Sequence, residues 1–237
     1  MLLLCLNTAS KQSAIALIEN NRVLAENEWV SAANESEKVL PGLEQVLADS
    51  GKTWDDLTHM VVVEGPGGYT SLRVGITIAN AIAWVKKIPM FNVNVFEVWE
   101  NRLSKKAQKQ PHAIAIAAGR DQWLVKGKIM TLEELKTLGM PCYGEVPDDI
   151  SGNANAVEMA SFGEALVQID FQNRSTVKSV QPVYTRPPLI TGKGLYCGFI
   201  KVLTLVINNL LKTNGNLSNF FAASFLESIS RTLGESR

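Results

Sequence analysis

The sequence predicts an α/β protein of two lobes, in which mixed sheets are flanked by helices and the second lobe is the smaller one. The first observation behind this prediction is a meander of three short apolar runs separated by polar turns, at residues 2–6, 13–18 and 22–30. The second is the alternation that follows, with helices at 36–48, 70–85 and 96–107 and strands at 60–63 and 88–93. Such an order predicts a mixed sheet that is covered by helices.

A smaller lobe is expected after the polar linker at residues 108–112. Its predicted elements are a strand at 113–117, a hairpin at 122–130, a helix at 132–138, a loop rich in Pro and Gly as far as 155, and a helix at 156–169. The element order of the first lobe is typical of the ribonuclease-H-like lobe that actin-type ATPases duplicate, and 237 residues can bury two modest cores. We therefore expect lobes at 1–107 and 108–190, and a tail at 191–237 whose role the sequence does not indicate.

The balance of charges and the use of cysteine limit the function classes. Lys and Arg together number 23, as do Asp and Glu, so no broad positive field holds a nucleic-acid backbone unaided. The three cysteines, Cys5, Cys142 and Cys197, lack the spacing of a zinc site or a disulfide framework and fit a cytoplasmic protein. The apolar stretch 195–211 is interrupted by polar residues, whereas a membrane span needs about 20 predominantly apolar ones. We expect no membrane segment.

A glycine-rich loop, Gly-Pro-Gly-Gly-Tyr-Thr at 65–70, lies directly between a predicted strand and the helix 70–85. Glycines allow close backbone approach, and a helix start offers unpaired N–H groups to an anion. The spacing fits neither a Walker A loop nor a dinucleotide fingerprint. A tight strand-to-helix turn and a phosphate loop shared with the turn at 7–10 therefore both stay open. The residues of such a phosphate site are Asn7, Thr8, Ser10, Gly65, Gly67, Gly68 and Thr70.

The helix at 70–85 is apolar on two opposite sides and needs cover on both. Its own sheet supplies only one. Gly75, Ala79 and Ala83 recur every four residues and predict a shallow groove into which another helix can pack. From periodicity alone, that helix is either the one at 39–47 in the same chain or one of a partner.

Three segments resemble a known family. Residues 64–83 contain Gly-Pro-Gly-Gly-Tyr-Thr-Ser-Leu-Arg-Val-Gly, residues 3–17 contain Asn-Thr-Ala-Ser between two strands, and residues 181–187 read Gln-Pro-Val-Tyr-Thr-Arg-Pro. In that order they resemble the signatures of the TsaB (YeaZ) family, with Gly68 where the family has Ser and Ser71 where it has Gly. The resemblance covers residues 1 to about 190, is weak at 108–172 and is absent from 191 onward.

The resemblance implies a function as well as a fold. It implies a non-catalytic partner subunit, a homodimer in the cytoplasm that binds a TsaD-type catalytic subunit for threonylcarbamoyl transfer to adenosine 37 of tRNA. It also implies a TsaE-type ATPase as a partner, contact with tRNA only through the complex, and ATP and magnesium that are used by the complex rather than held by this chain. The partner-binding residues, on the first two helices, are Val39, Leu43, Leu72, Arg73, Gly75, Ile76, Ala79 and Ala83.

Departures from related patterns argue against catalysis. Actin-fold ATPases carry a magnesium-binding Asp in the first turn, where this chain has Asn7, and a neutral amide is a poorer magnesium ligand. The TsaD pattern has an HxxxH metal motif, whereas His59 and His112 are far apart and Glu35 stands where TsaB proteins often have His. We therefore expect no catalytic residue and no metal site.

Two enzyme classes remain as alternatives. The chain can be an actin-fold ATPase or sugar-kinase relative that binds ATP in its own cleft, although Asn7 and the short second lobe argue against this. A peptidase lacks an identifiable nucleophile, since no Gly-x-Ser-x-Gly elbow or local Cys motif is present. The acidic pairs at 55–56 and 148–149 are expected to be solvated.

Arg73 is predicted to have an anionic partner, because a cation one turn into a helix is mildly unfavourable near the positive end of the dipole. A carboxylate of this chain, such as Glu64, can supply that charge, or an acidic group or a phosphate presented across a subunit interface.

Overall fold

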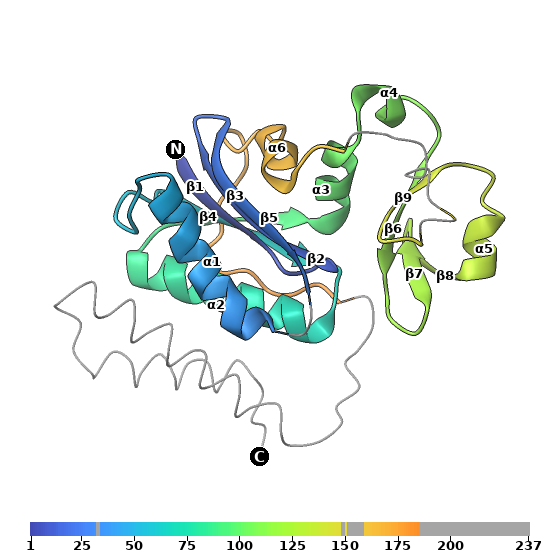
Figure 1. Cartoon of the computed structure of the whole chain (residues 1–237), viewed down its shortest axis with the longest axis horizontal. Coiled ribbons are helices and arrows are strands. Elements are labelled where there is room, and N and C mark those ends of the chain that lie inside the picture. Colours follow the sequence, from blue (N-terminus) through green and yellow to red (C-terminus); the bar gives the residue numbers. More distant parts are fainter. Residues whose placement is uncertain (32–33, 148–149, 151–158, 185–237) are drawn as a thin grey trace, which may run out of the picture. The chain divides into compact units, whose positions relative to one another are not determined.

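The computed structural model describes residues 1–31, 34–147, 150 and 159–184, and their strands form two sheets (Figure 1). The first sheet has the order β3-β2-β1-β4-β5. Its strands are β1 (Leu2–Asn7), β2 (Gln12–Glu19), β3 (Arg22–Val30), β4 (His59–Gly65) and β5 (Met90–Asn94). The first three pair antiparallel, and β4 and β5 are added in parallel, which confirms the predicted mixed sheet.

Helices cover both faces of the first sheet. On one face α1 (Glu35–Asp49) packs against β2 and β3, and α2 (Tyr69–Lys86) packs against β4 and β1 (Figure 1). On the other face lie α3 (Val95–Arg102) and α6 (Phe162–Val167). Because the inner strands β1 and β4 are covered twice, they contain continuous apolar runs rather than an alternating pattern, and every residue of β1 is buried.

Helix α1 is continuous over the predicted region. Its apolar residues fall on one buried face, and its exposed face carries Glu37, Lys38, Pro41, Glu44, Gln45, Ala48 and Asp49. Pro41 lies inside α1, which runs without a break from Glu35 to Asp49.

The second sheet repeats the pairing of the first. It has the order β8-β7-β6-β9, formed by β6 (Ala113–Ala117), β7 (Gln122–Val125), β8 (Lys128–Thr131) and β9 (Cys142–Gly144). Three antiparallel strands are again followed by one parallel strand, as in β3-β2-β1-β4. The short helix α5 (Leu132–Lys136) begins with a capping box of Thr131 and Glu134. The predicted class of two mixed sheets with helices is confirmed.

The helix expected at 96–107 is two helices. After α3 the chain becomes extended at Leu103, and α4 (Lys105–Gln108) starts from Ser104, whose side chain accepts a hydrogen bond from Ala107 N–H. Leu103 is buried against Tyr143 of the second sheet, together with Ala107. Burial of this side chain outside the helical path gives a physical reason for the break.

The C-terminal part of the described chain returns to the first sheet. The helix expected at 156–169 begins at Phe162, and residues 156–158 lie outside the described part. The sequence grouped this helix with the second lobe, but α6 packs against β2, β3 and α3. Glu26 accepts hydrogen bonds from Ser161 Oγ (2.6 Å) and Gly163 N–H (2.7 Å), which fasten the helix to β3. The boundaries 1–107, 108–190 and 191–237 stay predictions.

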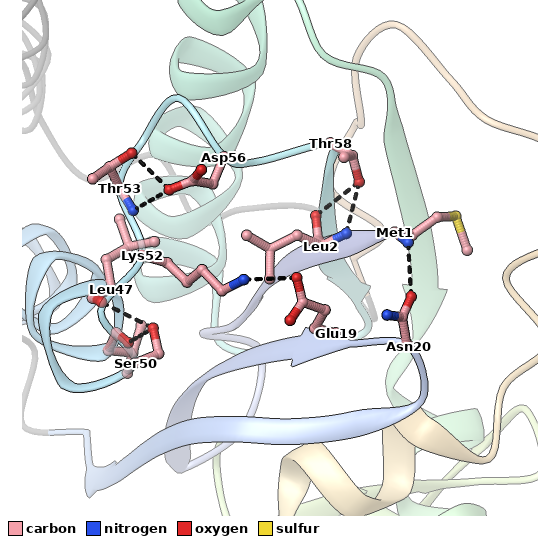
Figure 2. A network of polar contacts seen from close by, with 11 residues as sticks. Met1, Leu2, Glu19, Asn20, Leu47, Ser50, Lys52, Thr53, Asp56 and Thr58 are labelled. Carbon is pink, nitrogen blue, oxygen red and sulfur yellow. Dashed lines mark hydrogen bonds and ion pairs between the residues drawn. The ribbon is translucent and has the colours of Figure 1, made fainter.

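A network of polar contacts closes the edge where β1 begins (Figure 2). Thr58 Oγ accepts from Leu2 N–H and donates to Leu2 C=O, each at 2.9 Å, and Lys52 pairs with Glu19 at 2.7 Å. Residues 54–56 form a turn, in which Asp56 accepts from both the N–H and the hydroxyl of Thr53. These contacts join the start of β1 to the β2–β3 turn and the α1–β4 connection.

Among the helices that the structure describes, none combines the length and the apolar character needed to cross a membrane. The apolar stretch at 195–211 and Cys197 lie outside the described residues. Cys5 and Cys142 are buried free thiols, and burial raises the pKa of each.

Candidate functional site

The β1–β2 turn uses the Asn7 side chain for its own structure. Asn7 Oδ1 accepts a hydrogen bond from Ala9 N–H at 3.0 Å, and Asn7 Nδ2 donates to Ser10 Oγ at 3.2 Å. The residue is 3% exposed. Both ends of the amide are therefore engaged inside the turn.

The two segments predicted as a phosphate loop lie against each other. Gly68 N–H donates to Ala9 C=O at 3.3 Å, and a Cβ at Gly67 would lie 2.0 Å from the same carbonyl oxygen. Gly67 is thus required by the backbone of the neighbouring turn. Helix α2 begins at Tyr69, one residue after this contact. The structure brings the loops together, and whether they hold phosphate stays a prediction.

Most of the residues predicted to bind a partner are buried in the core of this chain itself. Seven of them are buried: Val39, Leu43, Leu72, Gly75, Ile76, Ala79 and Ala83. Helices α1 and α2 pack against each other, which supplies the second cover that α2 needs. Of the two interpretations left open by periodicity, packing by the helix of the same chain is therefore observed. A partner would meet the exposed faces of these helices, and its binding stays a prediction.

Gly75 is explained by a contact with the β1–β2 turn. A Cβ at this position would lie 2.0 Å from Thr8 Oγ1 and 2.8 Å from Thr8 Cγ2. The glycine therefore makes room for Thr8, whereas the sequence suggested a groove for another helix. The hydroxyl of Thr8 is buried and makes no hydrogen bond within the described part of the chain.

Arg73 belongs to an aromatic stack at the start of α2. Its Nη1 donates to Tyr69 Oη, and its guanidinium carbon lies 5.2 Å from the centre of the Tyr69 ring. The Tyr69 ring in turn lies 4.9 Å from that of Tyr184. Glu64, one of the two partners expected for Arg73, accepts a hydrogen bond from Asn92 Nδ2 at 2.7 Å.

The strap 177–184 crosses the sheet and α2, and sequence reasoning missed it. Val177 pairs with Met90 of β5 through two backbone hydrogen bonds, and Val183 N–H donates to Glu64 C=O at 2.7 Å. Between these points, Asn80 of α2 donates to Val180 C=O and accepts from Val180 N–H, each at 2.9 Å. The side-chain amide of Asn80 thus satisfies both backbone groups of Val180, as a neighbouring strand would. Asn80 is the one polar residue in the otherwise apolar stretch from Ile78 to Val85 of α2, and this is the signal that could have found the strap.

Glu145 joins the two sheets and was also missed. One carboxylate oxygen accepts from Ala117 N–H at 2.9 Å and the other accepts from Lys11 N–H of the β1–β2 turn. Burial raises the pKa of this carboxyl, although both N–H groups and the Lys11 charge oppose the rise. The residue follows β9, a strand of three residues that composition did not indicate.

The two histidines lie in separate places. His59 stacks on Phe91 at 5.0 Å between ring centres, whereas His112 pairs with Glu100 at 3.0 Å. Among the residues that the structure describes, no group of three His, Cys, Asp or Glu side chains is arranged to hold a metal ion.

A family model decides the relationship of this chain. The model of TsaD, tRNA N6-adenosine threonylcarbamoyltransferase, matches residues 28–231. The chain belongs to the TsaD family. The TsaD-family match extends well past residue 190, where the resemblance seen in the sequence ended.

Two curated relatives show how far the TsaD-family likeness extends. The TsaB protein of Bacillus subtilis (strain 168), named for tRNA threonylcarbamoyladenosine biosynthesis, is 34% identical over 97 residues, 41% of this chain and 42% of the relative. The tRNA N6-adenosine threonylcarbamoyltransferase of Bacillus thuringiensis (strain Al Hakam) is 25% identical over 172 residues, 65% of this chain and 48% of the relative. The chain thus spans less than half the length of these curated relatives, and the predicted resemblance to TsaB is confirmed.

A solved structure supports the fold of this TsaD-family chain. It is described as an uncharacterized protein with similarity to peptidase YeaZ from Pseudomonas aeruginosa, and it superposes with a TM-score of 0.60 at 18% identity. The match covers 78% of this chain and 99% of the other. At this identity the likeness concerns the fold alone.

Proposed function

We propose that the chain is a non-catalytic scaffold and activator subunit that dimerises and binds a TsaD-type catalytic subunit for threonylcarbamoyl transfer to adenosine 37 of tRNA. The observation that carries this proposal is the state of Asn7. Asn7 has a neutral amide in place of a carboxylate, and this amide is buried and hydrogen-bonded to Ala9 N–H and Ser10 Oγ. The first turn therefore offers magnesium no carboxylate from this position. Membership of the TsaD family supplies the reaction in which such a subunit takes part.

The accessible faces of α1 and α2 are the surface that we assign to the partner. The outer face of α1 is charged, with Lys38 and Glu44 exposed, and Trp84 near the end of α2 is 45% exposed. An exposed Trp is typical of the centre of a protein interface, and polar residues are typical of its rim. The buried residues of the two helices shape this surface from beneath.

The other partners follow from the same proposal. Equal numbers of acidic and basic residues leave the tRNA to be held mainly by another subunit. ATP and magnesium then serve the complex through a TsaE-type ATPase, and this chain needs no cofactor of its own. The complex works in the cytoplasm.

Reconstitution tests the proposal. We expect tRNA adenosine modification by TsaD-type and TsaE-type proteins to depend on this chain, while the chain alone hydrolyses no ATP above the buffer rate. Glu44→Lys on the outer face of α1 should weaken the complex, whereas Glu133→Lys, on the exposed face of α5, should not. Magnesium-dependent ATP turnover by the chain alone, lost in Asn7→Ala, would instead establish the actin-fold ATPase or sugar-kinase alternative.

A further inference from the structure

Two backbone N–H groups from different sheets converge on one carboxylate. Lys11 lies in the turn between β1 and β2, and Ala117 is the last residue of β6. Their N–H groups donate to the two separate oxygens of Glu145, Lys11 to Oε1 and Ala117 to Oε2. Residues 106 positions apart in the chain therefore share a single anion.

The backbone of Glu145 is held so that its side chain points at these amides. Its own N–H donates to Ala115 C=O at 2.9 Å, and its C=O accepts from the buried indole N–H of Trp123 at 2.8 Å. The residue before it, Gly144, has φ +111°, and a Cβ there would lie 2.4 Å from Ala115 O. Only glycine fits this conformation and this space.

The arrangement has the chemistry of an oxyanion site. Glu145 is 9% exposed, so its carboxylate is largely shielded from solvent, and the two amide donors compensate for the lost hydration. Convergent backbone N–H groups bind carboxylate and phosphate oxygens alike, because they recognise charge and lone-pair direction rather than the group that carries them.

We propose that the amides of Lys11 and Ala117 form an anion-binding site between the turns of the two sheets, and that the Glu145 carboxylate is its resident ligand. The side chain fastens the sheets to each other and excludes small external oxyanions, which bind there once it is removed. This inference goes beyond the proposed function and does not depend on it, because it concerns the isolated chain.

Chemical rescue tests the site. In Glu145→Ala the two amides lose their acceptor, which lowers the melting temperature, and formate should restore it. We expect a saturable rise of about 3 °C or more when formate is well above its dissociation constant. Inorganic phosphate tests the larger oxyanion in the same assay. The wild type and Glu133→Ala, measured at equal ionic strength with chloride as a reference, should show no such saturable rise. A folded Glu145→Ala that responds to formate and phosphate no more than the wild type would overturn the proposal.

A second variant covers the case in which Glu145→Ala does not fold. Glu145→Gln keeps the shape, but its NH₂ group cannot accept, so one of the two amides loses its bond. Hydrogen exchange followed by NMR should show faster exchange of the Lys11 or Ala117 amide, with the amide of Ala14 in β2 as an internal reference. Unchanged exchange at both positions would show that the carboxylate is not their ligand.

Discussion

At the scale of single residues, the contact between Gly75 and Thr8 decides how α2 meets the β1–β2 turn. Gly75→Ala places a methyl group 2.0 Å from Thr8 Oγ1, so side chain or helix must shift. We expect a loss of about 1–3 kcal/mol in the free energy of unfolding, although alanine favours the helix by about 1 kcal/mol. Urea unfolding of the wild type and the variant measures this difference.

Thr8→Ala provides the matched control for that contact. It removes the two Thr8 atoms nearest to the new methyl group, and it also removes a buried hydroxyl that has no partner in the described structure. The double variant should therefore recover most of the loss, which gives a coupling between the two sites. Gly67→Ala should not be recovered in this way, because its methyl group meets the backbone of Ala9. Equal losses in the single and double Gly75 variants would contradict the assignment.

Gly75 also shows what periodicity can and cannot predict. The spacing of Gly75, Ala79 and Ala83 revealed a helix face that something approaches closely. It could not reveal what lies opposite, because Thr8 is 67 positions away in the sequence and the contact depends on the tertiary fold. The same limit applies to Glu145, whose two donors come from different sheets.

The two histidines should titrate on opposite sides of their usual pKa of 6.5. Burial, with the charge of the N-terminus, lowers the pKa of His59. Burial also opposes protonation of His112, but hydrogen bonds with Glu100 and Gln110 C=O and the Glu100 charge raise its pKa overall. NMR titration of the imidazole signals should resolve both, and Glu100→Gln should lower only the pKa of His112.

The sign of the His112 effect on stability follows from this shift. Because its folded pKa is raised, the stabilisation is fully present below pH 6.5 and is lost as the pH rises through the folded value. The free energy of unfolding should show this loss in the wild type and a smaller one in Glu100→Gln. A His112 pKa that is the same in both proteins would mean that the contact with Glu100 is not formed in solution.

At the scale of elements, Asn80 fixes the strap to α2. Asn80→Ala removes a donor and an acceptor that pair with Val180, so we expect a loss of about 1–3 kcal/mol in the free energy of unfolding. Hydrogen exchange of the Val180 amide should accelerate more than that of the Met90 amide, which is held by Val177.

Two further variants separate the clamp from a general loss of stability. Asn80→Asp keeps the acceptor for Val180 N–H but turns a carboxylate oxygen toward Val180 C=O, so it should be no better than alanine. Gln45→Ala on the exposed face of α1 removes only an exposed hydrogen bond to Asp49 and should leave exchange in the strap unchanged. Exchange at Val180 that stays as slow in Asn80→Ala as in the wild type would contradict the clamp.

The elements that could be predicted are those with a strong local signal. The three-strand meander and helices α1 and α2 have apolar patterns that are long enough to specify their type. Strand β9 has three residues and depends on its pairing with β6, and the break at Leu103 depends on burial against Tyr143. Both are tertiary effects, and no local pattern carries them. The repeated strand order of the two sheets was likewise hidden, because it lies in pairing directions rather than in side chains.

At the scale of the whole molecule, the sequence predicted which segments meet in the candidate site, but it did not predict what their residues do there. The turn at 7–10 and the loop at 65–70 do lie in contact, as a shared site requires. Gly67 of the loop, however, makes room for the backbone of Ala9, and Gly75 of the predicted partner helix α2 makes room for Thr8 of this chain. At the start of α2, Gly68 and Thr70 are exposed, and the side chains of Tyr69 and Arg73 are partly exposed.

Arg73 should matter to the assembled complex through its planar group. Lysine keeps the charge but cannot reproduce the flat contact with the Tyr69 ring or a two-pronged grip on an anion. In a reconstituted assay of tRNA adenosine modification, we expect Arg73→Lys to lose nearly as much activity as Arg73→Ala, about tenfold or more, while both melt close to the wild type. Tyr69→Phe removes the hydroxyl that Arg73 contacts and keeps the ring, so it separates a role in holding Tyr69 from a role in the complex. A lowered melting temperature in both Arg73 variants would show that the residue stabilises this chain rather than the complex. Full activity with full stability in both would show that Arg73 has no part in the complex.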